Sequence, residues 1–168
     1  MKILSIALLL STAAANAESE LMPAELVARV KALGAKVVVH EIWQSESKTQ
    51  VFLSGVGTGS NEWLRVARAI QPDTDAASAE ELNYALAEAL VNNPYAVLPW
   101  LQELWWNDKQ LVCLFAYDSE LPGGVSAYIV RLENALKNHP PVGSKSIRLQ
   151  CLRGIKNTKS ALATTQQE

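Results

Sequence analysis

Histidine and cysteine are scarce in this chain, with two residues of each among its 168 residues. Zinc centres and nucleophilic catalytic sites draw mainly on these residue types, so the composition disfavours both classes of enzyme. Carboxylates alone can cleave glycosides, so a carboxylate-based hydrolase remains an alternative. We therefore expect a protein that is not an enzyme and that has no catalytic residue, metal or cofactor.

The chain also has no excess of basic residues and only one long apolar run, which lies at its N-terminus. The formal net charge is −2, from 15 basic and 17 acidic side chains, whereas nucleic-acid binding requires an excess of cations on one face. No later run reaches the roughly 20 apolar residues that cross a bilayer. Apolar residues make up 49% of the chain, enough for the core of one domain, so we expect neither a nucleic-acid partner nor a membrane span in the mature protein.

The N-terminal run has the pattern of an export signal. Met1-Lys2 provides a positive start, residues 3–15 are apolar or small, and Ala15-Asn16-Ala17 fits a cleavage site. We expect residues 1–17 to be a signal peptide and the mature protein to lie in the periplasm. A permanent membrane anchor is the weaker alternative, because the run is short.

Cys113 and Cys151 both remain in the mature chain. An even number of cysteines in an oxidising compartment favours a disulfide. Closing a loop of about 39 residues would stabilise the fold by about 4 kcal/mol in the chain-entropy model. The alternative is two buried free thiols.

Apolar residues recur at helical spacing along most of the mature chain, which predicts an all-α fold. Residues 18–156 should form a single compact helical domain of five to seven helices with one disulfide, and residues 157–168 a flexible polar tail. The clearest helix is expected over residues 79–91, where Ser78 and Glu81 form a capping box. Further helices are expected after an Asn61 cap, from Asn93-Pro94, over residues 125–136 and after Ser144.

Two segments are harder to assign. Residues 24–57 combine helical spacing with the runs Val37-Val38-Val39 and Val51-Phe52-Leu53, so a β-hairpin across residues 45–48 is an alternative to helices. Pro99 lies about one turn inside the expected third helix, where it should kink that helix or confine it to its first turn.

Residues 57–98 contain the segments GTGSNEWLRVARAI, PDTDAASAEELNYALAEAL and NPYAVL. These resemble a group of small uncharacterised exported, all-helical proteins of Gram-negative bacteria that share G-x-x-x-W-L-x-V-A, T-D-A and N-P-x-x-V-L. The resemblance covers about a quarter of the chain in detail. It implies a helical fold, including the region before Gly57, and a later cysteine pair that Cys113 and Cys151 match. It implies no activity and no catalytic residue, and Pro99 departs from the pattern.

Three short motifs resemble functional sites but lack a necessary member. His40-Glu41 would begin a zinc-binding H-E-x-x-H motif, but Gln44 stands at its last position. The glycine run 55–59 lacks both phosphate-loop spacings, so we interpret it as a connection between helices. The acidic cluster over residues 73–81 lacks the glycine and glutamate of a calcium loop, and acidic residues there complement the dipole of the next helix.

Charge is distributed unevenly along the chain. Residues 18–108 carry 13 acidic and six basic side chains, whereas residues 109–168 carry four acidic and eight basic ones. No acid occurs between Asn134 and Gln167, so the candidate contacts for an acidic partner are Arg148, Arg153 and Lys156. The alternative is a solvated helix face that happens to be basic.

Tryptophan is concentrated after residue 99, at Trp100, Trp105 and Trp106. An exposed member of this cluster would suit an interface, and we list all three as candidates for partner binding. The alternative places two of them in the core and one half-buried.

These features favour a periplasmic protein-binding module, most concretely an immunity-type inhibitor of a toxin or of a cell-wall hydrolase. The alternatives are a structural or accessory subunit of an envelope assembly and the carboxylate-based hydrolase. The sequence leaves the oligomeric state open.

Overall fold

The computed structural model describes residues 21–104, 123–138 and 140–165. Within these ranges the chain forms eight α-helices and one 3₁₀ turn and has no strand, so the all-α prediction is confirmed and the number of helices exceeds five to seven. The elements are α1 (Pro23–Leu33), α2 (Ala35–Trp43), α3 (Glu46–Gly57), α4 (Asn61–Ile70), η1 (Gln71–Asp73), α5 (Ala76–Asn92), α6 (Pro94–Leu104), α7 (Gly124–Lys137) and α8 (Lys145–Thr165).

The N-terminal segment that the sequence left ambiguous is helical throughout. Gly34, with a φ of 88°, separates α1 from α2, and the Ser45 hydroxyl caps α3. Val38 and Ile42 are fully buried while Val37 is 43% exposed. His40, midway between Val38 and Ile42, is exposed, whereas a strand that buried Val38 and Ile42 would bury His40 on the same face. The hairpin alternative is therefore wrong for this segment.

Two predicted helix caps lie at different residues. The Ser60 hydroxyl, not the Asn61 side chain, caps α4 by accepting from the Trp63 amide at 3.3 Å. In α5 the cap is Asp75, which accepts from the Ser78 amide at 2.9 Å, while the Asp75 amide donates to the Ser78 hydroxyl at 3.0 Å. Helix α5 starts about one turn earlier than predicted, because the capping box of Asp75 and Ser78 precedes the predicted box of Ser78 and Glu81.

Helix α6 begins at Pro94 as predicted, and it does not stop at Pro99. The Asn93 side-chain amide donates to the Gly59 carbonyl at 2.9 Å, which holds the start of α6 against the α3–α4 connection. The helix then passes through Pro99 and reaches Leu104. Pro99 therefore does not confine α6 to one turn.

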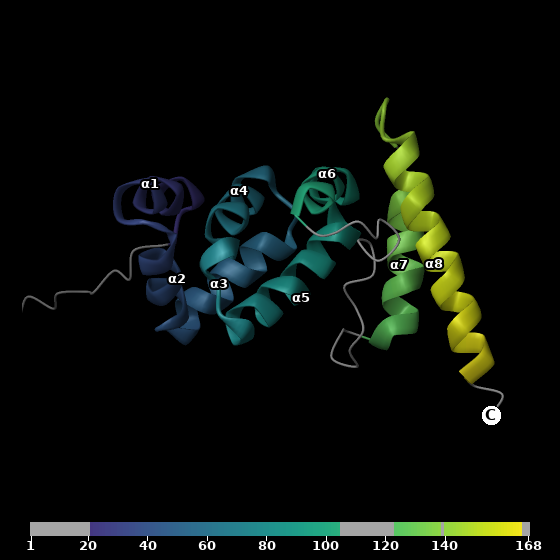
Figure 1. Ribbon diagram of the computed structural model, residues 1–168, viewed down its shortest axis with the longest axis horizontal. Helices are drawn as coiled ribbons and strands as arrows, with labels where there is room; N and C mark the ends of the chain where they lie inside the picture. Colours follow the sequence, from purple (N-terminus) through teal and green to yellow (C-terminus); the bar gives the residue numbers. More distant parts are fainter. Residues whose placement is uncertain (1–20, 105–122, 139, 166–168) are drawn as a thin grey trace, which may run out of the picture.

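Helix α5 lies at the centre of the molecule, where it packs on α3, α6 and α7 (Figure 1). Its residues Leu82, Leu86 and Leu90 are almost completely buried. Helices α7 and α8 form an antiparallel pair at one end of the molecule, here called the C-terminal hairpin, in which α8 packs on α7 (Figure 1). Helix α8 continues past Lys156 to Thr165, so regular structure extends into the region predicted to be a polar tail.

Candidate functional site

The glycine run that resembled a phosphate loop packs closely against neighbouring side chains. Gly55 is buried in α3 against the indole of Trp63, and a Cβ atom at this position would lie 2.3 Å from Trp63 Cε2. Gly59 has a φ of +71°, and a Cβ there would lie 2.7 Å from Asn93 Cβ. The run therefore forms the end of α3 and the turn to α4, where close packing requires glycine at positions 55 and 59.

The other two motifs also have local partners. His40 Nε2 lies 2.5 Å from the Gln44 side-chain amide within α2. In the acidic cluster, Asp75 caps α5 and Glu81 accepts from Trp43 Nε1 at 2.8 Å. Among the residues that the structure describes, no group of three histidine, cysteine or acidic side chains is placed to hold a metal ion.

Polar contacts join the C-terminal hairpin to the central helices. Arg131 on α7 forms two hydrogen bonds with the Glu88 carboxylate on α5, at 3.0 and 2.7 Å. The Tyr95 hydroxyl on α6 donates to the Leu136 carbonyl on α7 at 2.6 Å. Burial raises the pKa of Tyr95, and the nearby positive charge of Arg148 partly offsets this effect. These contacts fix the direction in which the hairpin leaves the body of the protein.

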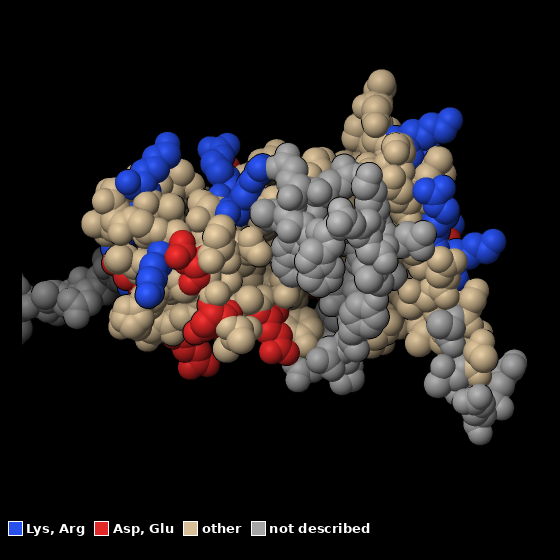
Figure 2. All heavy atoms as spheres, in the orientation of Figure 1, with Lys and Arg blue, Asp and Glu red and all other residues tan. Residues whose placement is uncertain are grey.

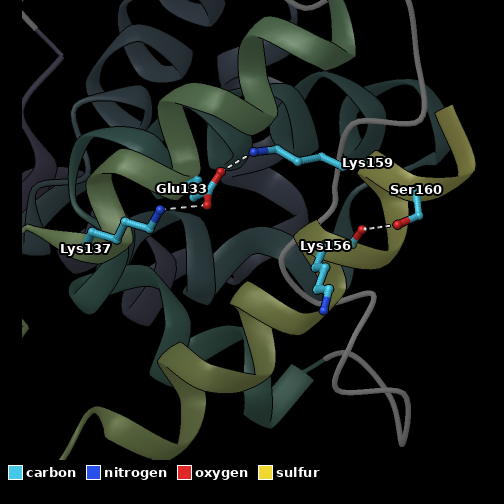
Figure 3. Close-up of polar contacts among 5 residues, drawn as sticks. All are labelled: Glu133, Lys137, Lys156, Lys159 and Ser160. Carbon is cyan, nitrogen blue, oxygen red and sulfur yellow. Dashed lines mark hydrogen bonds and ion pairs between the residues drawn. The ribbon is translucent and has the colours of Figure 1, made fainter. Parts of the chain in front are cut away.

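Glu133 joins the two helices of the hairpin to each other. Its carboxylate accepts hydrogen bonds from Lys137 on α7, at 2.7 Å, and from Lys159 on α8 (Figure 3). These two bonds lower the pKa of Glu133 to about 2. Lys159 is consequently paired, unlike the lysines on the outer side of α8.

The outer side of α8 carries a stripe of positive charge. Lys145, Leu149, Arg153 and Lys156 follow one another at intervals of four, four and three residues, so they share one helix face, here called the basic face. All four side chains are exposed, and α8 contains no acidic residue. None of the three cations forms an ion pair with any residue in the described ranges. Figure 2 shows the resulting positive charge along the α8 end of the molecule.

The structure separates the residues predicted to bind a partner. Arg153 and Lys156 lie on the basic face, whereas Arg148 is half-buried and its Nε atom is shielded from solvent. Trp100 is only 5% exposed and belongs to the core, so it is not a surface contact. Trp105, Trp106 and Cys113 lie outside the described residues. Cys151 is fully buried in α8.

Three buried polar atoms have no hydrogen-bond partner in the part of the chain that the structure describes. They are Trp100 Nε1 on α6, Tyr128 Oη on α7 and Arg148 Nε on α8. Burial, with a smaller contribution from Glu88, raises the pKa of Tyr128 well above its usual value. All three atoms lie on α6 to α8, and the helical spacing of the sequence did not identify them.

The turn between α7 and α8 lies where the sequence predicted a break between two helices, but the exposure of its apolar side chain was not predicted. Residues 140–144, here called the hairpin tip, project past the ends of the neighbouring helices (Figure 1). Val142 in this tip is 107% exposed, the largest exposure among the large apolar side chains described. A cavity of about 400 Å³, lined by Tyr95, Pro99 and Val142 among others, lies between the tip and α6.

No helix in the described ranges combines the length and the apolar character needed to cross a bilayer. No protein-family model, curated protein or solved structure matches this chain. The resemblance to the group of exported helical proteins therefore stays a prediction.

Proposed function

We propose that this protein is an exported protein-binding module that docks an acidic protein partner on the basic face of α8. In its most concrete form it is an immunity-type inhibitor of a toxin or of a cell-wall hydrolase in the periplasm. The observation that carries the proposal is the set of three exposed cations, Lys145, Arg153 and Lys156, that have no acidic partner among the described residues.

The arrangement of these cations supports a docking role. Some cations elsewhere in the fold are paired with carboxylates, as in the Arg29–Glu41 pair at 2.5 Å and the Arg131–Glu88 pair at 2.7 Å. On the basic face no such pairing occurs over about 16 Å of helix. An acidic surface would complement these charges, and the field of the helix would speed the encounter.

The predicted disulfide between Cys113 and Cys151 belongs to the same proposal, because it presumes export to an oxidising compartment. The complete burial of Cys151 in α8 supports a structural role for its sulfur. Such a bridge would tie α8 to the chain that precedes α7 and so support the helix that presents the basic face.

A capture experiment with matched charge reversals tests the proposal. The mature protein is immobilised and used to capture partners from a periplasmic extract, and the captured protein is identified by mass spectrometry and purified. Binding of this purified partner is then compared for wild type, for Arg153→Glu with Lys156→Glu, and for Lys31→Glu with Lys36→Glu. The control pair changes the net charge equally, and both of its lysines are exposed at the far end of the fold.

We expect the α8 variant to associate at least tenfold more slowly and with a weaker salt dependence, while the control pair changes the association rate much less. Equal effects of the two pairs would show that net charge alone matters and would contradict docking on α8. A partner that belongs to an envelope assembly would favour the structural-subunit alternative. Cell-wall hydrolysis by the protein itself would favour the hydrolase.

A further inference from the structure

The start of α5 carries exposed negative charge that no described cation neutralises. The acidic cluster provides four exposed carboxylates there, here called the acidic face: Asp73 in η1, Asp75 at the N-cap, and Glu80 and Glu81 in the first two turns of α5. None of the four forms an ion pair with any residue in the described ranges. Glu81 accepts a hydrogen bond from the Trp43 indole, which is neutral and leaves the charge in place.

The acidic face and the basic face of α8 complement each other. The first carries four negative charges and the second three positive ones. Each face also has apolar atoms between its charges. Leu149, which is 41% exposed, lies between the cations of α8, and the exposed residues Ala76 and Ala77 lie between the aspartates and the glutamates of the acidic face. Opposite charges arranged around an apolar contact are typical of surfaces that recognise each other.

The two faces lie on different parts of the molecule. The acidic face lies beside the end of α2, which contacts η1 and donates the hydrogen bond from Trp43 to Glu81. The basic face lies on α8, in the hairpin at the other end of the molecule (Figure 1). Figure 2 shows acidic side chains gathered along the lower edge of the body and cations along the α8 end. A contact between these two faces therefore joins two molecules.

We infer that copies of this chain associate head to tail, with the acidic face of one copy docked on the basic face of α8 in the next. Because the two faces differ, each bound copy leaves one of its own faces free, and further copies can add. The charges are exposed, so the contact is weak and depends on salt. This inference goes beyond the proposed function, because it needs no second protein. It adds that another copy and an acidic partner compete for the same surface.

Sedimentation equilibrium of the purified mature protein tests the inference. The weight-average mass is measured over a hundredfold range of protein concentration, in about 0.05 M and about 0.5 M sodium chloride, where the screening of exposed charges differs strongly. Two charge-reversed variants each lose one face. The α8 variant is Arg153→Glu with Lys156→Glu, and the acidic-face variant is Asp73→Lys with Glu80→Lys.

Matched controls change the net charge equally at other exposed sites. Lys31→Glu with Lys36→Glu is the control for the α8 variant, and Glu25→Lys with Glu62→Lys, on α1 and α4, is the control for the acidic-face variant. The acidic-face variant keeps the N-cap of α5 and the hydrogen bond of Trp43. Circular dichroism establishes that each variant is folded.

We expect the mass of the wild type to rise with concentration at low salt and to return to that of the monomer at high salt. Each charge-reversed variant should associate with itself at least tenfold more weakly than the wild type, whereas each control should differ less than threefold. An equimolar mixture of the two charge-reversed variants should form a heterodimer and nothing larger, because each variant contributes one intact face.

Four results would refute head-to-tail association. They are a wild type that stays monomeric at low salt, self-association that persists in either charge-reversed variant, controls that are weakened as much as those variants, and a mixture of the two variants that does not associate. None of these results bears on the docking of an acidic protein partner, because the capture experiment measures that binding separately. Failure of the inference and failure of the proposed function are therefore distinguishable.

Discussion

Replacing Gly55 by alanine adds one methyl group at the tightest contact around the glycine run. The new Cβ atom would lie 2.3, 2.5 and 2.7 Å from Cε2, Cδ2 and Nε1 of Trp63. These distances are about 1 Å shorter than normal van der Waals contacts, so the indole must move. Trp63 cannot shift freely, because its ring packs edge-on against Phe52 at a centroid separation of 6.1 Å, and Phe52 is fully buried.

The magnitude follows from two opposing effects. Alanine in a helix is favoured over glycine by about 1 kcal/mol, which would stabilise α3. Overpacking a core typically costs about 1–3 kcal/mol. Gly55→Ala displaces a tryptophan that also packs on a buried phenylalanine, so we expect its overpacking cost to lie at or above the upper end of this range. We expect Gly55→Ala to lower the free energy of unfolding by about 2 kcal/mol.

Gly57→Ala in the same helix is the matched control. A Cβ there meets Glu88 Cβ at 3.8 Å, which is ordinary contact, so this variant should be unchanged or more stable by about 0.4–1 kcal/mol. Both free energies are measured by urea unfolding followed by far-ultraviolet circular dichroism. If Gly55→Ala is as stable as Gly57→Ala, the close approach of α3 to Trp63 is not a constraint and the argument is refuted.

Three further predictions concern other contacts. Protein purified from the periplasm should have no titratable thiol until it is reduced and unfolded, and Cys151→Ala should lower the melting temperature; two reactive thiols in the unreduced protein would exclude the disulfide. The pKa of Glu133 is about 2 in the fold and near 4.5 without its partners, so the Lys137 and Lys159 bonds stabilise the protein above about pH 4.5, and this contribution is lost as the pH falls toward 2. Glu133→Gln should remove that part of the acid dependence in urea unfolding at pH 7, 4 and 3, whereas an unchanged profile would show that the contact contributes nothing. Asp75→Ala removes the N-cap of α5 and should cost about 1 kcal/mol, while Asp73→Ala, which removes an aspartate that does not cap α5, should cost much less; equal losses would contradict the cap assignment.

The helical class of this protein could be predicted from the sequence because each helix buries one face. Leu82, Leu86 and Leu90 recur at helical spacing in the sequence and are almost fully buried in α5. Val38 and Ile42 show the same spacing. The run Val37-Val38-Val39, however, also favours a strand, so only tertiary packing determines that this segment is helical. The cap of α5 was missed because Asp75 and Ser78 satisfy the same rule as the Ser78–Glu81 pair, one turn earlier.

The candidate surface was predicted only in part. The absence of acids after Asn134 identified Arg153 and Lys156, because charge is visible in a sequence. It did not separate them from Arg148, whose burial depends on how α8 rotates against its neighbours. The exposure of Val142 depends on the angle at which two helices meet, and the fit of Gly55 beneath Trp63 joins residues of different helices. Neither the exposure of Val142 nor the packing of Gly55 can be predicted from the neighbouring residues in the sequence.

The attachment of the C-terminal hairpin has a consequence for how the protein opens. Helix α8 packs on α7, and α7 in turn reaches the body through α5 and α6, with the Glu88–Arg131 and Tyr95–Leu136 bonds at the junction. Within the described ranges, this packing and these bonds join the hairpin to the remaining helices, whereas α5 packs on α3, α6 and α7. We expect the hairpin to form its own unit of local unfolding, whose amide hydrogens exchange while the body around α5 stays folded, and native-state hydrogen exchange measures this. Such a protein would open first at the end that carries the basic face.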